Sequence, residues 1–213
     1  MSLIGIVRSR VIARAVLRYS AIALALAALL VLPGCWVESI NPLYEDGFLS
    51  SKDPDVVFDQ NLIGSWIVVG DNCEAPVTIT AKDDVYDLQS TERSEDEGCA
   101  ESDKTSHDQA RLVKLDNYYF LDLSPMAEEV CARCLAKHDI YLAKFDKSML
   151  SITPIDSDWL KKALTAKKIT LATLGDDPDT ITASSRELKT FCRRFAGNKM
   201  VFKPESTTTF KRK

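Results

Sequence analysis

Cysteine is the residue type best placed to do chemistry in this chain, which has six cysteines and only two histidines. Cys131 and Cys134 are two residues apart, the spacing of thiol pairs that exchange electrons when the pKa of the first thiol is depressed. This reading makes the chain a thiol oxidoreductase. However, Ser124 and Pro125 begin a predicted short helix, which places Cys131 mid-helix, away from the terminal amides that would stabilise a thiolate. The sequence therefore weighs against redox catalysis.

Zinc binding is a second chemistry that cysteines can provide, because zinc is held tetrahedrally by four thiolate or imidazole ligands. The candidate ligands are Cys73, Cys99, Cys131 and Cys134. They form one close pair and two scattered residues, whereas two close pairs are typical of zinc knuckles. His138 is an alternative ligand, but it begins a predicted strand. Leu135 stands where haem attachment requires histidine, so the sequence predicts neither a metal nor a cofactor.

The N-terminal leader accounts for the sixth cysteine. Residues 1–34 contain four arginines and no acidic residue, and an apolar run covers residues 21–32. This layout is typical of a secretory signal peptide, and the run is shorter than the roughly 20 residues that span a bilayer. The run ends in Leu32-Pro33-Gly34-Cys35, which resembles the lipobox of bacterial lipoproteins. Ordinary secretion and a retained membrane anchor are the alternatives.

The resemblance to bacterial lipoproteins implies a cellular location as well as a membrane anchor. Cleavage before Cys35 would remove a signal peptide of residues 1–34, and Cys35 would carry acyl chains such as palmitate. Two or more chains hold a protein stably on a membrane. The expected location is the bacterial cell envelope, facing the periplasm. Trp36 rather than aspartate follows Cys35, and this slightly favours the outer over the inner membrane.

An exported location also favours disulfide bonds. Cys73, Cys99, Cys131 and Cys134 are then expected to staple loops together. The simplest pairing joins Cys73 to Cys99 and Cys131 to Cys134, although sequence alone leaves the connectivity open. Cys192 is left over and lies on the apolar side of a predicted helix, where we expect a buried free thiol.

Charge and motif content narrow the functional classes further. Four of the 27 basic residues lie in the leader, so the chain from Cys35 onward holds 23 basic and 31 acidic residues, a formal charge of −8. This balance disfavours a nucleic-acid partner. No nucleophile elbow accompanies His107 and Asp108, and no phosphate loop occurs. The sequence therefore predicts no catalytic residues and a protein that is not an enzyme.

Short, β-branched segments dominate the middle of the chain. Seven strands are predicted, over residues 62–69, 76–81, 85–91, 110–115, 118–123, 139–145 and 149–155. Tight turns at 82–84, 116–117 and 146–147 alternate with longer connections at 70–75, 92–109 and 124–138. In an up-and-down meander the alternate connections share one end. The longer connections, which carry four cysteines, should therefore gather at one rim of an antiparallel barrel or a strongly curled sheet.

Two helices are predicted near the C-terminus, which makes the fold mainly β with some α. Asp156 and Ser157 cap the first helix, which runs to about Ala166. Ser184 and Glu187 form a capping box for the second, whose apolar positions recur with helical spacing. The second helix is expected to close an end of the sheet or to pack on its outside.

Gly64-Ser65-Trp66 at the start of the first strand resembles the GxW motif of lipocalins, whose tryptophan closes the narrow end of a barrel. The chain from Cys35 is also similar to uncharacterised small bacterial lipoproteins, in Asn41-Pro42-Leu43-Tyr44 and in the Leu62–Trp66 segment. The lipocalin resemblance implies a barrel that holds an apolar ligand. The lipoprotein resemblance implies no activity.

Together these features predict a signal peptide (1–34), a flexible tether (35–60), a barrel-like domain with C-terminal helices (61–203) and a basic tail (204–213). We expect a lipid-anchored, non-catalytic envelope protein that binds an apolar small molecule or an envelope protein. The alternatives are a structural or assembly lipoprotein without a ligand cavity, and a thiol oxidoreductase that uses Cys131 and Cys134. Membrane contact is expected through the acyl chains on Cys35, with no nucleic-acid partner.

Overall fold

The computed structural model describes residues 37–45, 53–70, 76–94, 100–126, 135–175 and 177–213, all within one compact unit, Trp36–Lys213. The elements are β1 (Glu38–Ser39), β2 (Val56–Val57), η1 (Gln60–Leu62), β3 (Gly64–Val68), β4 (Pro76–Lys82), β5 (Val85–Ser94), β6 (Ala100–Leu115), β7 (Tyr118–Pro125), β8 (His138–Phe145), β9 (Met149–Pro154), α2 (Ser157–Thr165), β10 (Thr173–Leu174), β11 (Asp177–Ile181), α3 (Ser185–Phe195), η2 (Pro204–Ser206) and β12 (Thr208–Arg212). Within these ranges no helix is long and apolar enough to cross a membrane.

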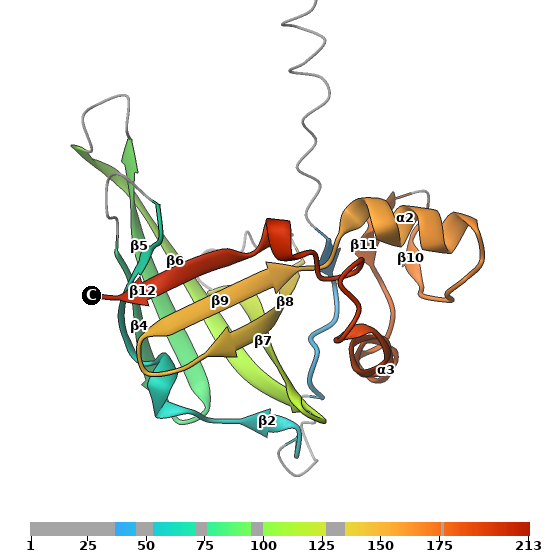
Figure 1. Ribbon diagram of the computed structural model, residues 1–213, viewed down its shortest axis with the longest axis horizontal. Helices are drawn as coiled ribbons and strands as arrows, with labels where there is room; N and C mark the ends of the chain where they lie inside the picture. The colour runs from blue at the N-terminus through green and yellow to red at the C-terminus, as the bar shows by residue number, and fades with distance from the viewer. Residues whose placement is uncertain (1–36, 46–52, 71–75, 95–99, 127–134, 176) are drawn as a thin grey trace, which may run out of the picture. The chain divides into compact units, whose positions relative to one another are not determined.

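Eight of the strands form a closed antiparallel barrel (Figure 1). Strands β3 to β9 pair each with the next in chain order, and β12 lies between β9 and β3, where it completes the ring. The prediction of an antiparallel up-and-down barrel with two C-terminal helices is therefore confirmed. Closure leaves no free edge among these eight strands, so each backbone can pair on both sides.

Alternate residues of the barrel strands enter two different cores. Leu112, Leu121 and Ala143 belong to the core inside the barrel. Their neighbours Val113, Phe120 and Leu142 belong to a second core on the outer face. Because successive strand residues point to opposite faces, near-continuous apolar runs in β6, β7 and β8 indicate strands that are buried on both sides.

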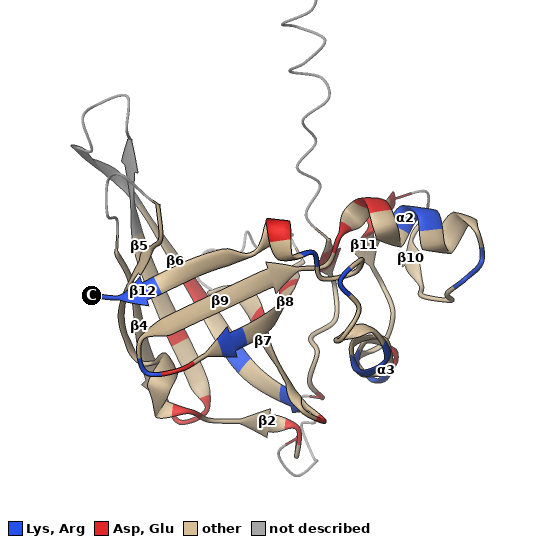
Figure 2. Cartoon of the chain, viewed as in Figure 1, with Lys and Arg blue, Asp and Glu red and all other residues tan. Residues whose placement is uncertain are grey.

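The helices α2 and α3 cover that outer face (Figure 1). Asp156 caps α2 by accepting a hydrogen bond from the backbone N–H of Trp159 at 2.7 Å. Ser184 and Glu187 form the predicted capping box at the start of α3. Leu188, Phe191 and Cys192 are buried against the sheet, while most of the charged residues of α3 are exposed (Figure 2). The second helix therefore packs on the outside of the barrel.

The predicted flexible tether is wrong for the described parts of residues 35–60. β1 pairs with β8 and β11, and β2 pairs with β6. Leu43 is fully buried in the outer core, and its backbone N–H donates to Asp122. The sequence did not predict these contacts. The segment packs through single side chains between turn-forming residues, so it has no periodic apolar pattern.

An ion-pair network fixes the second half of this segment to α3. The Lys189 ammonium lies 2.6 Å from Asp53 Oδ2 and 2.8 Å from Asp55 Oδ2, and Arg193 also contacts Asp55 at 2.9 Å. Burial by itself raises the pKa of Asp53. Hydrogen bonds from Lys189 and from the N–H groups of Glu45 and Asp55 outweigh burial, so the pKa is lowered.

The predicted basic tail of residues 204–213 is also wrong, because it contains the strand that closes the barrel. Thr208 pairs with Ile152 of β9, and Phe210 pairs with Val68 of β3. The threonines and phenylalanine of β12 have high strand propensity. The three basic residues at positions 211–213 suggested a solvated tail. The strands that pair with β12, β3 and β9, lie far away in the sequence.

The longer connection predicted at 92–109 is largely strand. β5 continues to Ser94 and β6 begins at Ala100, while β7 pairs with β6 only from Asp108 onward. The outer part of β5 and β6 is therefore a two-stranded ribbon beyond the barrel (Figure 1). A ribbon of two strands encloses no core, so its sequence lacks the apolar alternation that strand prediction needs.

Candidate ligand cavity inside the barrel

The end of the barrel that carries the short turns is closed around Trp66. The 3-10 turn η1 leads directly into β3, and the fully buried Trp66 donates from Nε1 to the carbonyl of Leu62 at 2.9 Å. Arg212 of β12 stacks on the indole ring, with Cζ 4.3 Å from the ring centroid. Trp66 therefore contacts Leu62, close to it in sequence, and Arg212, near the C-terminal end of the sequence.

The Arg212 guanidinium fastens three segments at this end. Nη1 donates to the carbonyl of Ile63 and Nη2 to that of Asn61, each at 2.6 Å, while Nε donates to Lys147 in the β8–β9 turn. A Cβ atom at Gly64 would lie 2.2 Å from Nη1, and Gly64 has a φ of +142°. Glycine precedes Ser65-Trp66 because no side chain fits beside this guanidinium.

Large side chains fill the interior next to this closed end. Leu62, Tyr86 and Leu112 are at most 1% exposed. The Tyr86 hydroxyl donates to the carbonyl of Asp59 and accepts from its N–H, at 3.1 and 2.7 Å. This satisfied hydroxyl and the packing around it leave no space for a ligand here.

Further along, the interior contains an apolar cavity of about 180 Å³. Its apolar walls come from six barrel strands. The apolar lining residues are Trp66, Val77, Ile79, Leu88, Leu121, Leu123, Leu150, Ile152 and Phe210. Ser90, Ser106 and Asp108 are its polar lining residues, and they lie on β5 and β6 toward the start of the ribbon. The barrel is therefore filled at one end and hollow towards the other.

Two titratable residues face the same interior from β8. Asp139 pairs with Leu123, and Tyr141 pairs with Leu121; directly paired residues project from the same face of a sheet. Burial raises the pKa of Asp139 to about 6, and the nearby carboxylates of Glu38, Asp108 and Asp122 add to this effect. Burial, Asp139 and Asp108 likewise raise the pKa of Tyr141. The interior next to the cavity is thus acidic in character.

Sequence reasoning missed these residues. Strand alternation through Leu121, Leu123 and Tyr141 was readable, and would have placed Asp139 on the inner face. Its association with Asp108 depends on strand register, which sequence does not supply.

The histidine considered as a zinc ligand is engaged elsewhere. His138 begins β8 as predicted, and its Nδ1 lies 2.6 Å from Oδ1 of the buried Asp122. Tyr44 packs edge-on against the imidazole, with ring centroids 6.4 Å apart. Among the described residues there is no group of three or more metal-binding side chains.

Of the predicted cysteine sites, the described ranges contain only Cys192. It is a free thiol with no exposed surface, and burial raises its pKa, which makes the thiolate inaccessible. Cys35, Cys73, Cys99, Cys131 and Cys134 lie outside the described residues, as does the signal peptide of residues 1–34. Lipidation, disulfide pairing and thiol redox chemistry therefore stay predictions.

The comparisons with known proteins do not add a family. No family model matches the chain, and no curated protein or solved structure matches it either. A binding role is compatible with the barrel, because closed eight-stranded barrels of the lipocalin type enclose small ligands.

Proposed function

We propose that this protein is a lipid-anchored, non-catalytic binding protein of the bacterial cell envelope, and that its barrel holds an apolar group of a small ligand. The observation that carries the proposal is the 180 Å³ cavity, whose lining is almost entirely apolar. A pocket with mostly apolar walls and a few polar groups at one side favours an apolar occupant.

The size of the cavity limits what enters it. An engineered apolar cavity of about 150 Å³ binds benzene, whereas pockets for drug-sized ligands have volumes of roughly 300–1,000 Å³. This barrel therefore accommodates one ring or the end of an acyl chain, and not a whole lipid.

The anchor rests on the lipobox resemblance at Cys35. Val37, two positions later, is buried in the outer core. Two extended residues reach at most about 7 Å. If Cys35 carries acyl chains, the barrel is therefore held close to the bilayer surface, without a long flexible linker.

Toluene binding tests the cavity. We expect toluene to shift the methyl NMR signals of Leu121, Leu123 and Ile152 in a saturable way. Val77→Phe should abolish these shifts, because the larger ring occupies the cavity. Thr78→Phe is the matched control, since Thr78 is exposed on the same strand.

Two results would contradict the proposal: no saturable shift in the unmodified chain, or equal toluene binding by Val77→Phe. Either result would favour the alternative, a structural or assembly lipoprotein whose barrel is only a scaffold.

A further inference from the structure

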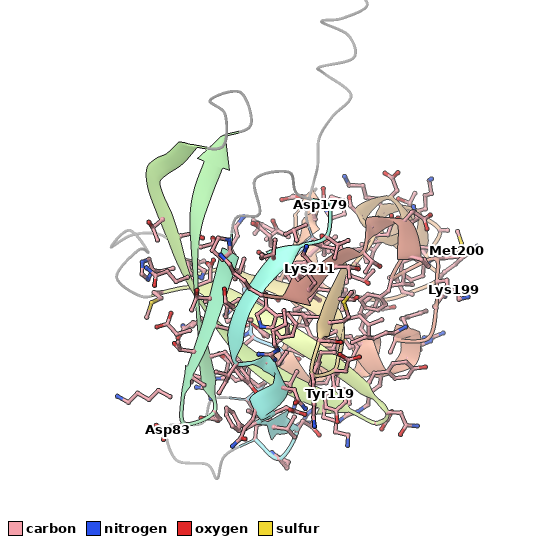
Figure 3. The ribbon with its side chains drawn as sticks, turned by 60° about the vertical axis from the view of Figure 1, so that its left-hand side comes forward. Asp83, Tyr119, Asp179, Lys199, Met200 and Lys211 are labelled. Atoms are coloured by element: carbon pink, nitrogen blue, oxygen red, sulfur yellow. The ribbon has the colours of Figure 1, made fainter. Side chains whose placement is uncertain are left out.

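A second pocket of about 410 Å³ lies on the outer face of the barrel. Its base is formed by β7, β8 and β9, and its walls by the segment after α3 and by η2. Lys144 pairs with Ser151, and Leu142 pairs with Thr153, so these four residues project from the same outer face. Figure 3 shows Lys199, from the opposite wall, on the side of the molecule away from the β5–β6 ribbon.

The lining of this pocket is positively charged. Lys144 and Lys199 line it, and no acidic residue does. Neither lysine forms an ion pair with the described residues. Other lysines are neutralised: Lys161 contacts Asp179, and Lys203 contacts Asp156.

The Asp146 carboxylate, two residues after Lys144, is not among the residues that line the pocket. Its Oδ1 accepts hydrogen bonds from the N–H and hydroxyl of Ser148 and from the N–H of Met149, all within the β8–β9 turn. In a chain with a net charge of −4, an acid-free pocket with two unpaired lysines selects an anion.

Neutral hydrogen-bonding groups also line the pocket. Thr153 and Thr207 pair through their hydroxyls at 2.8 Å, Ser151 shares a hydrogen bond with Thr209 at 3.2 Å, and Tyr118 adds a further hydroxyl. Asn198 accepts a hydrogen bond from Met200 through Oδ1, which leaves its amide NH₂ as a donor. Buried Phe202 and Leu142 supply an apolar surface. Such a lining suits a ligand that carries hydroxyls on a short carbon skeleton.

Gly197 preserves the shape of the pocket. A Cβ atom at this position would lie 2.8 Å from the Tyr118 hydroxyl oxygen. An alanine there would force the tyrosine to move, although the backbone at Gly197 does not require glycine. Gly197→Ala therefore perturbs the pocket without removing a charge.

We propose that this outer pocket binds a polyol phosphate, with glycerophosphate as the minimal ligand, either free or as the headgroup of a phospholipid. Lysines bind phosphate as point charges. As a free ligand, the phosphate monoester carries about −1.5 to −2 charges at pH 7, which matches Lys144 and Lys199; in a phospholipid headgroup the phosphate is a diester and carries less charge. The volume lies within the roughly 300–1,000 Å³ of small-molecule sites. This site is separate from the barrel cavity and does not depend on it.

NMR titration of the full chain in dodecyl maltoside micelles tests the site. sn-Glycerol 3-phosphate should produce saturable shifts at the amides of Ser151, Gly197 and Asn198. A second titration uses short-chain phosphatidylglycerol in the same micelles, with phosphatidylcholine as the zwitterionic control. Tighter binding of free glycerol 3-phosphate indicates a soluble ligand, and tighter binding of phosphatidylglycerol indicates a headgroup.

Variants distinguish the pocket from general surface charge. Lys144→Gln with Lys199→Gln should weaken binding at least tenfold, and Gly197→Ala should weaken it without any change in charge. Lys162→Gln with Lys168→Gln removes the same charge from exposed positions around α2 and should leave the affinity unchanged. The proposal is overturned if neither phosphate compound gives saturable shifts, or if both lysine pairs weaken binding equally.

Discussion

Gly64, Trp66 and Arg212 show how residue type is fixed by contacts rather than by local propensity. Arg212 donates to the carbonyls of Asn61, Ile63 and Lys147 while it stacks on Trp66. Glycine is needed at position 64 because a Cβ would overlap the guanidinium. The GxW pattern therefore depends on an arginine about 150 residues later in the chain.

Arg212→Met should test this arrangement. The variant keeps the aliphatic stem but leaves three carbonyls without their donor, and we expect a loss of about 3 kcal/mol in unfolding free energy. Urea denaturation provides the measurement. Lys213→Met, at the exposed chain end, is the control, and a similar loss in both variants would contradict the role of the guanidinium.

Asp139 carries a pH dependence of opposite sign to that of most carboxylates. Its pKa is raised from 3.8 to about 6 in the folded protein. The folded state therefore binds the proton more tightly, so this group makes stability fall as pH rises from about 4 to 6. Above pH 6 Asp139 is ionised in the folded protein, and the burial of its charge lowers the free energy of unfolding by the full amount.

Asp139→Asn is accordingly expected to stabilise the protein at pH 7.5. Because Asp139 is partly exposed, solvent screening limits the gain to about 1 kcal/mol. At pH 4 the gain should disappear. Urea denaturation at both pH values measures the difference. An equal gain at pH 4 would contradict the raised pKa of Asp139 in the folded protein.

At the element scale, β12 decides whether the sheet closes. It is the only described strand that pairs with both β9 and β3, and the two would otherwise be edges. Lys213 also donates its N–H to the carbonyl of Ser65 at 2.9 Å. A few terminal residues thus complete the ring of strands.

Truncation after Thr207 should abolish cooperative unfolding. It removes β12, exposes the edges of β3 and β9 and opens the inner core. Truncation after Arg212 removes only Lys213 and should leave a cooperative transition. Near-UV circular dichroism during thermal unfolding distinguishes these outcomes, and a cooperative transition in the shorter chain would refute the closing role of β12.

The docking of residues 53–55 on α3 depends on Lys189, whose side chain is 10% exposed. Lys189→Met leaves the buried Asp53 without its cation, and we expect a cost of about 3 kcal/mol at pH 7. The lowered pKa of Asp53 means that its contribution is present above pH 4 and is lost as pH falls through the folded-state pKa. The cost should therefore shrink at pH 2.5.

Urea denaturation at pH 7 and pH 2.5 measures this change, with Lys168→Met as the control at an exposed position. An equal cost at the two pH values would show that Lys189 acts through packing alone.

At the scale of the whole molecule, the proposed anchor and the first docked residues act together. Val37 and Leu43 are buried against the outer face of the barrel, so residues 37–45 form part of the folded body. An anchor at Cys35 would then set the distance of the barrel from a membrane.

Cys35→Ser should therefore leave the protein unprocessed and remove its acyl chains. Mass spectrometry of the membrane fraction measures both. Cys192→Ala also removes one thiol but leaves the lipobox intact, so it should be processed like the parent. Normal processing and membrane retention of Cys35→Ser would rule out the anchor.

Local patterns were enough to predict part of this fold. Alternation in β4, tight turns beginning near Asp83 and Asp116, and the capping box of Ser184 and Glu187 involve contacts between residues close in sequence. Cys192 was placed correctly on a buried helix face for the same reason. The outer part of β6 was missed, because a two-stranded ribbon has no buried face to impose a pattern.

The sequence alone determined the order of strands β3 to β9, the helix caps and the apolar character of the interior, because each of these depends on neighbours within a few residues. Only the tertiary structure decided that Thr208–Arg212 closes the barrel, that residues 37–45 dock on its outer face, and that Lys144 and Lys199 share a pocket. These outcomes depend on pairing between distant segments. The free energy that stabilises these contacts comes from surfaces that form only when the chain folds.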